Sequence, residues 1–107
     1  GGEWIATGVL EALISEHPDV AAVAVIARPD ERWGERPLAV VQPRGVLAKE
    51  EARAGLEESL RAHLAAAVEQ GRLARFWIPD RFIFVEQLPL TSAGKINKVA
   101  LRRELVG

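Results

Sequence analysis

Residues 88–98 of the chain read Leu88-Pro89-Leu90-Thr91-Ser92-Ala93-Gly94-Lys95-Ile96-Asn97-Lys98. An apolar, strand-like run precedes this stretch at 82–85, and apolar residues at helical spacing follow it at 99–105. Small residues and a glycine beside a basic side chain suit a loop that approaches an anion closely. The ammonium group of Lys95 has three donors for charge that develops on a carboxylate or a phosphate. We call residues 88–97 the lysine loop and expect the rest of the chain to be organised around it.

The ends of this stretch exclude a phosphate-binding P-loop. That motif needs a glycine five positions before its Gly-Lys pair and a serine or threonine after the lysine. Here Pro89 occupies the first glycine position and Ile96 follows Lys95. From spacing alone, a polar turn with a solvated lysine stays open as the alternative.

Length and composition limit the fold and the partners of the chain. With 107 residues, of which 49% are hydrophobic, it is expected to form one domain with a small core. A formal net charge of −1 argues against a nucleic-acid partner, and no apolar run reaches transmembrane length. There is no cysteine and the two histidines are far apart, so we expect no metal site. No signal peptide opens the sequence, and the expected location is the cytoplasm.

An amphipathic helix is predicted near the start of the chain. Thr7 is expected to cap a helix that runs to about Glu16. Its buried face is predicted from apolar residues at helical spacing, which are Val9, Leu10, Leu13 and Ile14. His17, which precedes Pro18, is expected to end the helix and to act there as a cation favoured by the helix dipole.

Two strands and a long helix are predicted next. Apolar runs at 20–27 and 37–42 are separated by a short charged turn, which favours an antiparallel hairpin. Residues 49–70 are predicted to form a helix that ends at Gly71. Its apolar stripe is expected to contain Leu56, Leu60, either His63 or Leu64, and Ala67, with His63 expected to lie at the boundary. Its opposite face is expected to meet water through Glu57, Glu58, Arg61 and Glu69.

A third strand and a last helix flank the lysine loop. The run 81–86 alternates, with Phe82 and Phe84 on one face and Ile83 and Val85 on the other. Asn97 is predicted to cap the last helix, and its inward residues are expected to be Val99, Leu101 and Leu105. The whole pattern predicts an α+β fold, with a small three-stranded sheet packed by helices.

The motif Leu-Pro-x-Thr-Ser-x-Gly-Lys-Ile at 88–96 resembles the terminal lysine motif of the adenylate-forming superfamily, which includes acyl-CoA synthetases, peptide-synthetase adenylation domains and luciferases. Three further segments match in the family's order: Gly1-Gly2-Glu3-x-Ile5, His17-Pro18-x-Val20 and the turn at 29–37. The resemblance covers nearly the whole chain. It implies that residues 1–107 are the C-terminal lid domain of an AMP-forming acyl-CoA synthetase, without the N-terminal ATP- and acyl-binding domain and the hinge.

The resemblance also implies roles for single residues. Lys95 would be the catalytic lysine of adenylation, with Lys98 as the second choice. Gly2 would lie against the thiol arm of coenzyme A, and Trp33 and Phe76 would pack against the coenzyme. Without the resemblance, Trp33 could equally cover an edge of the core and Phe76 could fill it. Relatives often carry basic residues around the proline at position 79, where this chain has Ile78 and Asp80, so Arg75 or Arg81 would take over contacts to the phosphates.

The implied activity is that of an acid–thiol ligase. Its substrates would be a carboxylic acid, of the fatty-acid type, with ATP and coenzyme A, and Mg²⁺ would be held by the N-terminal domain. The isolated chain is expected to be inactive. Two alternatives remain: a non-catalytic binding or scaffold module that reuses the fold, and the C-terminal part of a peptide-synthetase-type adenylation domain. Which acid is used, and whether the acceptor is coenzyme A or a carrier protein, is not set by these residues.

Overall fold

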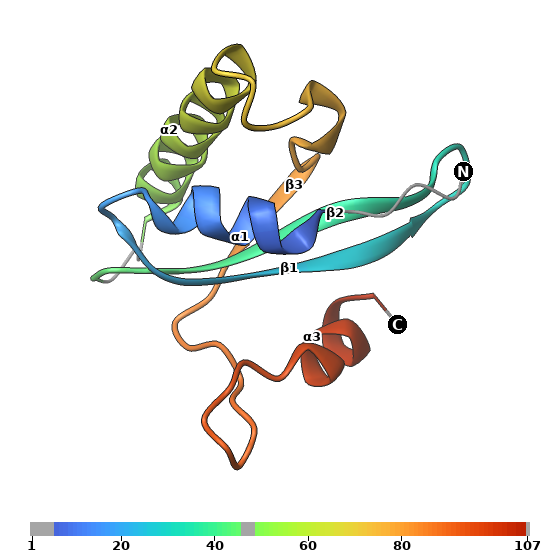
Figure 1. The fold of residues 1–107 in the computed structure, drawn as a ribbon. Helices are drawn as coiled ribbons and strands as arrows, with labels where there is room; N and C mark the ends of the chain where they lie inside the picture. Colours follow the sequence, from blue (N-terminus) through green and yellow to red (C-terminus); the bar gives the residue numbers. More distant parts are fainter. Residues whose placement is uncertain (1–5, 46–48, 107) are drawn as a thin grey trace.

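A computed structural model describes residues 6–45 and 49–106. Its elements, in chain order, are α1 (Thr7–Ser15), β1 (Val20–Asp30), β2 (Gly34–Pro43), α2 (Glu50–Glu69), a single 3₁₀ turn (Arg75–Trp77), β3 (Arg81–Phe84) and α3 (Lys98–Leu105). Three helices and a three-stranded sheet confirm the predicted α+β fold (Figure 1). The first two strands are longer than predicted, and the third is shorter.

The sheet is mixed, in the order β1-β2-β3. β1 and β2 form the predicted antiparallel hairpin, in which Val25 pairs with Ala39. β3 adds to the other side of β2 in the parallel direction, with Leu38 opposite Arg81 and Val41 opposite Phe84. A parallel neighbour needs a long crossover, and α2 with the segment after it supplies one. The chain therefore leaves β3 at one end of the sheet and enters the lysine loop there.

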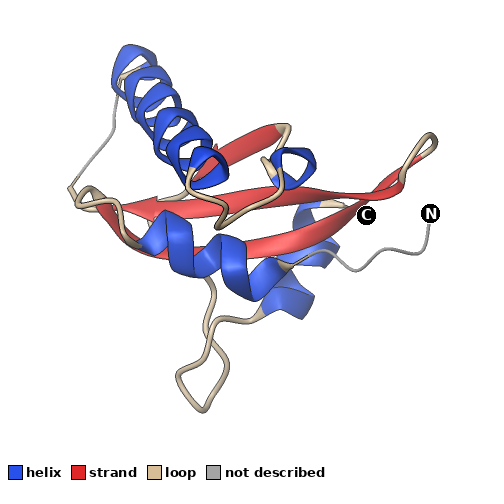
Figure 2. Ribbon diagram, turned by 45° about the horizontal axis from the view of Figure 1, so that its top comes forward, coloured by secondary structure: helices blue, strands red, loops and turns tan. Residues whose placement is uncertain are grey.

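Helices cover both faces of the sheet (Figures 1 and 2). Side chains alternate along a strand, so β1 sends Val23 and Val25 to one face and Ala24 and Ile26 to the other. The first face packs against α1 and α2, and the second packs against α3 and Leu88. β3 follows the predicted alternation, because Phe82 and Phe84 join the first core and Ile83 and Val85 join the second.

The long helix α2 behaves as its pattern predicts. Its buried residues are Leu56, Leu60, Leu64 and Ala67. It ends where Gly71 adopts a left-handed conformation, with φ of 75°. The amides of Gly71 and Arg72 donate to the carbonyls of Val68 and Ala67, at 3.0 and 2.9 Å, which is the paired pattern of a Schellman motif. Glycine at this position carries no steric penalty, so the sequence alone locates this helix end.

Three predictions about helix residues are wrong. Thr7 is the first helical residue of α1, and the N-cap is Ala6, with no side-chain cap. Val9 is exposed, because it lies outside the face of α1 that packs against the sheet through Leu10, Leu13 and Ile14. Val99 is exposed as well: it lies two positions before the buried Leu101, about 200° around the helix.

His17 was predicted to be a cation at the end of the helix, and its hydrogen bonds contradict this role. It is 9% exposed, and its Nδ1 accepts the backbone N–H of Asp19 at 3.1 Å. An amide can only donate, so Nδ1 carries no proton and the ring proton lies on Nε2, 2.7 Å from Ser59 Oγ. His17 therefore joins the end of α1 to α2 as a neutral side chain. His63 is a boundary residue, as predicted, with Nε2 2.9 Å from the carbonyl oxygen of Leu13.

Candidate functional site

The lysine loop forms a small hairpin that projects from the body of the domain (Figures 1 and 2). An isolated antiparallel bridge joins Leu90 to Ile96, and the amide of Thr91 donates to the carbonyl of Lys95 at 2.7 Å. The amide of Gly94 donates to the carbonyl of Thr91 at 2.9 Å, and the hydroxyl oxygen of Thr91 accepts the amide of Lys95 at 3.2 Å. Gly94 closes this turn with φ of 82°. The turn thus fixes the backbone that carries Lys95.

Both ends of the loop are anchored. Leu88 is buried in the second core, and its amide donates to Oε1 of Gln42 at 2.9 Å. At the other end the amide of Asn97 donates to the carbonyl of Pro89 at 2.7 Å. The side chain of Asn97 accepts the amide of Ala100 at 3.0 Å, so the predicted cap of α3 is confirmed. A loop with anchored ends and an exposed turn can present a side chain such as that of Lys95 to a site outside this domain.

The two lysines in this region have different surroundings. Lys95 is exposed, and within the described part of the chain its ammonium group has no ion-pair partner. Nζ of Lys98 lies 2.9 Å from Oε2 of Glu11, and the same oxygen accepts the backbone N–H of Val25 at 2.8 Å. Lys98 is therefore tied into the fold, and Lys95 is available to an external anion.

Trp33 and Phe76 lie side by side, although 43 residues separate them in the chain. Their ring centroids are 5.1 Å apart in an edge-to-face arrangement. Trp33 is 46% exposed and Phe76 is 38% exposed, so neither fills the core. The guanidinium carbon of Arg32 lies 4.9 Å from the Trp33 ring centroid. We call Trp33 and Phe76 the aromatic platform; beside it is a shallow pocket of about 400 Å³.

The residue that holds the platform in place was not singled out from the sequence. Arg36 is buried, and its Nε and Nη2 donate to the two carboxylate oxygens of Asp80 at 2.8 and 3.0 Å. Its Nη1 donates to the carbonyl of Phe76 at 2.5 Å, and Nη2 also donates to that of Ile78 at 3.0 Å. The hydrogen bond from Arg36 lowers the pKa of Asp80, and Asp80 in turn raises the pKa of Arg36. The one signal available in the sequence was an aspartate beside Pro79.

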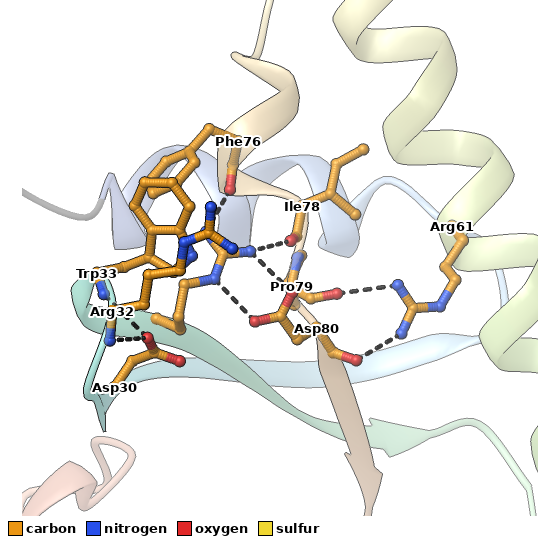
Figure 3. Close-up of polar contacts among 9 residues, drawn as sticks. Asp30, Arg32, Trp33, Arg61, Phe76, Ile78, Pro79 and Asp80 are labelled. Atoms are coloured by element: carbon orange, nitrogen blue, oxygen red, sulfur yellow. Dashed lines mark hydrogen bonds and ion pairs between the residues drawn. The ribbon is translucent and has the colours of Figure 1, made fainter.

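A second arginine, on α2, also binds backbone carbonyls of the segment 76–80. Nη1 and Nη2 of Arg61 donate to the carbonyls of Pro79 and Asp80, each at 2.9 Å (Figure 3). Its Nε donates to Glu57 at 3.0 Å. Arg61 was predicted to face water, and its side chain is 36% exposed while its guanidinium group also binds this segment. It covers the Phe82 ring with its guanidinium group, 4.9 Å from the centroid.

Of the remaining predicted site residues, Arg75 lines the pocket beside the aromatic platform, and Arg81 does not. Arg75 is exposed and forms an ion pair with Glu69 at 3.3 Å. Arg81 is exposed at the start of β3. Gly2 lies outside the described residues. Within residues 6–45 and 49–106, no group of three or more His, Cys, Asp or Glu side chains could hold a metal ion. No helix in the same part of the chain is both long enough and apolar enough to cross a membrane.

A comparison with protein-family models matches residues 9–95 to the AMP-binding enzyme C-terminal domain. This match spans most of the chain, including the aromatic platform and Lys95. The chain therefore belongs to the AMP-binding enzyme C-terminal domain family, as its motifs indicated.

Curated and solved proteins agree with this assignment. The chain is 43% identical over 104 residues to the long-chain-fatty-acid–CoA ligase of Thermus thermophilus, a match to 97% of this chain and 17% of that protein. It is 37% identical over 102 residues to the 2-methylpropanoate–CoA ligase CCL4 of Humulus lupulus, covering 95% and 17%. The Mycobacterium tuberculosis fatty acyl CoA synthetase superposes with a TM-score of 0.77 at 33% identity, covering 99% of this chain and 19% of that one. The chain thus spans 17% of the length of these curated relatives.

Proposed function

We propose that the chain is the mobile C-terminal domain of an AMP-forming acyl-CoA ligase, in which Lys95 acts in adenylation and the aromatic platform contacts coenzyme A. The proposal is supported by the family assignment and by the names of the relatives, which are CoA ligases. The nucleotide site, the acid site and any Mg²⁺ site are assigned to the remainder of the enzyme.

The reaction consists of two half-reactions. In the first, a carboxylate oxygen attacks the α-phosphorus of ATP, which gives an acyl adenylate and releases pyrophosphate. In the second, the thiol of coenzyme A attacks the acyl carbon and AMP leaves. Negative charge is concentrated between the carboxylate and the phosphate during the first step. An ammonium group placed between them stabilises that charge most strongly where water is excluded.

The observation that carries the proposal is the position of Lys95. The lysine is exposed on a projecting turn whose base is fixed, and it has no internal partner in the described part of the chain. Lys98, in contrast, forms an ion pair with Glu11 and contributes to the fold. A rigid turn also limits the entropy lost when Lys95 enters a site on another domain.

The aromatic platform has the chemistry that coenzyme A requires. Flat exposed rings suit stacking against an adenine or contact with the pantetheine arm, and cations beside them suit phosphates. Arg32 and Arg75 are both exposed next to the two rings. The platform and the lysine loop are separate parts of the domain. A hinge rotation between half-reactions would present Lys95 first and the platform, together with Gly2, afterwards.

The acid is proposed to be of the fatty-acid type, because the Thermus ligase named for long-chain fatty acids is 43% identical. A ligase named for 2-methylpropanoate is 37% identical over nearly the same residues. Similar C-terminal domains thus accompany acids of different size, so the choice of acid belongs to the rest of the enzyme.

Replacing Lys95 in the full-length enzyme tests the proposal. Lys95→Ala is expected to lower ATP–pyrophosphate exchange by about a hundredfold or more, the usual cost of one such contact. Thioester formation from supplied acyl adenylate should be largely retained. Lys49→Ala, which removes an exposed lysine at the start of α2, is the matched control and should leave both rates unchanged. An equal loss of both half-reactions in Lys95→Ala would contradict the role in adenylation.

The isolated chain provides a second check. It contains the lysine loop without a nucleotide pocket, so residues 1–107 alone should show no ATP–pyrophosphate exchange. Turnover by this fragment would refute the division of labour between the two parts of the enzyme.

A further inference from the structure

Four backbone carbonyls between residues 76 and 80 are bound by two guanidinium groups (Figure 3). Arg36 binds those of Phe76 and Ile78, and Arg61 binds those of Pro79 and Asp80. The two arginines come from β2 and α2, so this segment is fixed to two elements that are far from it in sequence. Backbone carbonyls of a surface segment usually bind water instead. With four of the five carbonyls of residues 76–80 bound in this way, we expect the backbone conformation of this segment to be important for function.

Of the two arginines, Arg36 has the contacts that depend more closely on the geometry of a guanidinium group. Its side chain is 7% exposed, and four hydrogen bonds use donors on all three of its nitrogen atoms. Asp80 accepts two of these bonds while its own side chain stays 52% exposed. The guanidinium fork meets the carboxylate and the two carbonyls at once, which a lysine ammonium cannot reproduce.

The same guanidinium group supports the aromatic platform directly. Its carbon lies 4.6 Å from the ring centroid of Phe76, which in turn meets Trp33 edge to face at 5.1 Å. Trp33 is held separately, because Oδ1 of Asp30 accepts the amides of Arg32 and Trp33, each at 2.9 Å. One ring thus extends from the turn between β1 and β2, and the other extends from the segment that Arg36 binds.

We propose that Arg36 is a positioning residue for the thioester-forming half-reaction: by binding Asp80 and the carbonyls of Phe76 and Ile78, it fixes the Phe76 ring against Trp33 as a rigid surface for coenzyme A. The proposal rests on the proposed function, since it assumes that the platform contacts the coenzyme. It adds a residue that itself need not touch the substrate. A pre-set surface binds more tightly because less side-chain and loop ordering is lost on binding.

The test compares the two half-reactions of the full-length enzyme. Arg36→Lys keeps the charge beside Asp80 but cannot bind both carbonyls, so the KM for coenzyme A should rise about tenfold. ATP–pyrophosphate exchange should stay within about twofold of the unchanged enzyme. Arg44→Lys is the matched control, because Arg44 is exposed just beyond the other end of β2. It should change neither quantity.

Trp33→Ala and Phe76→Ala separate the failure of this proposal from the failure of the proposed function. If they raise the KM for coenzyme A and Arg36→Lys does not, Arg36 has no positioning role although the platform contacts the coenzyme. If they leave that KM unchanged, the contact itself is absent and both statements fail. An equal loss of both half-reactions in Arg36→Lys would show a purely structural role and overturn the proposal.

Asp80→Asn keeps the test decisive if Arg36→Lys does not fold. Asp80 is half exposed, and its replacement leaves the two carbonyl contacts of Arg36 in place. The KM for coenzyme A should then rise about threefold, with pyrophosphate exchange unchanged. In that case an unchanged KM, with Trp33→Ala raising it, would reject the positioning role.

Discussion

The ammonium group of Lys98 lies 2.9 Å from the carboxylate of Glu11, and this ion pair joins α3 to α1 around the edge of the sheet. α1 covers one face and α3 covers the other, with the edge strand β1 between them. The same carboxylate oxygen accepts the backbone N–H of Val25, on β1, at 2.8 Å. Glu11 thus connects the helix at the start of the chain with the helix that follows the lysine loop.

Glu11→Ala is expected to destabilise the chain more than Lys98→Ala. The first change leaves the buried Val25 amide without its acceptor, which costs about 2 kcal/mol. The second removes only a partly exposed ion pair, worth about 0.5 kcal/mol. Urea unfolding of residues 1–107 measures both. Equal losses would show that the ion pair, and not the strand amide, dominates the role of Glu11.

Gly94→Ala should impair the lysine loop through backbone conformation alone. A Cβ added at Gly94 meets nothing within 4 Å, but its φ of 82° is unfavourable for alanine, by about 1 kcal/mol. The turn should loosen, and adenylation by the full-length enzyme should fall severalfold. Gly55→Ala is the matched control, because its Cβ also meets open space but lies within α2, where alanine is the better helix former. It should stabilise the chain; if Gly94→Ala had the same effect, the turn would not depend on its left-handed residue.

Asn97→Ala should fray the start of α3. Its side chain accepts the amide of Ala100, and loss of an N-cap costs about 1 kcal/mol. Asn97→Asp retains an acceptor at the same position and should remain within a few tenths of a kcal/mol. Hydrogen exchange at Ala100 and Leu101 reports the fraying directly. Equal protection of these amides in both variants would show that tertiary contacts, and not the cap, hold the helix start.

The ion pair between Arg36 and Asp80 should make stability depend on pH in the acid range. Arg36 holds the pKa of Asp80 below its usual value of 3.8 in the folded chain. The stabilising contribution is therefore complete above that value and is lost as the pH falls through the lower pKa of the folded state. Asp80→Asn should be less stable than the original chain at pH 7, and the difference should shrink below about pH 4.

Thermal unfolding across pH 2 to 7, a range set by the carboxyl titration, measures this difference. Glu58→Gln is the control, since Glu58 is exposed on α2 and forms no ion pair with the described residues. A constant difference between Asp80→Asn and the original chain over the whole range would contradict the role of the ionised carboxylate.

The sequence correctly predicted those structural features that depend only on residues close together in the chain. Gly71 ends α2, Asn97 caps α3, and the apolar runs around the charged turn form an antiparallel hairpin. Each of these features needs only a few consecutive residues, whose backbone preferences act in the unfolded chain as well. The order of motifs also identified the family, which the comparison with family models confirms. The role of Lys95 stays a prediction, although its exposure on a fixed turn is consistent with it.

Only the tertiary structure decided the features that depend on distant residues. Arg36 binds Asp80 although 44 positions separate them in the sequence, and Trp33 contacts Phe76 although 43 positions separate them. Both contacts form because β3 pairs in parallel with β2, which places the segment before β3 beside the turn between β1 and β2. The burial of His17 arises in the same way, from its contact with Ser59 on α2. The sequence gives the chemical type of each charged or polar side chain. Its partner depends on tertiary packing, which brings together residues that are far apart in the sequence.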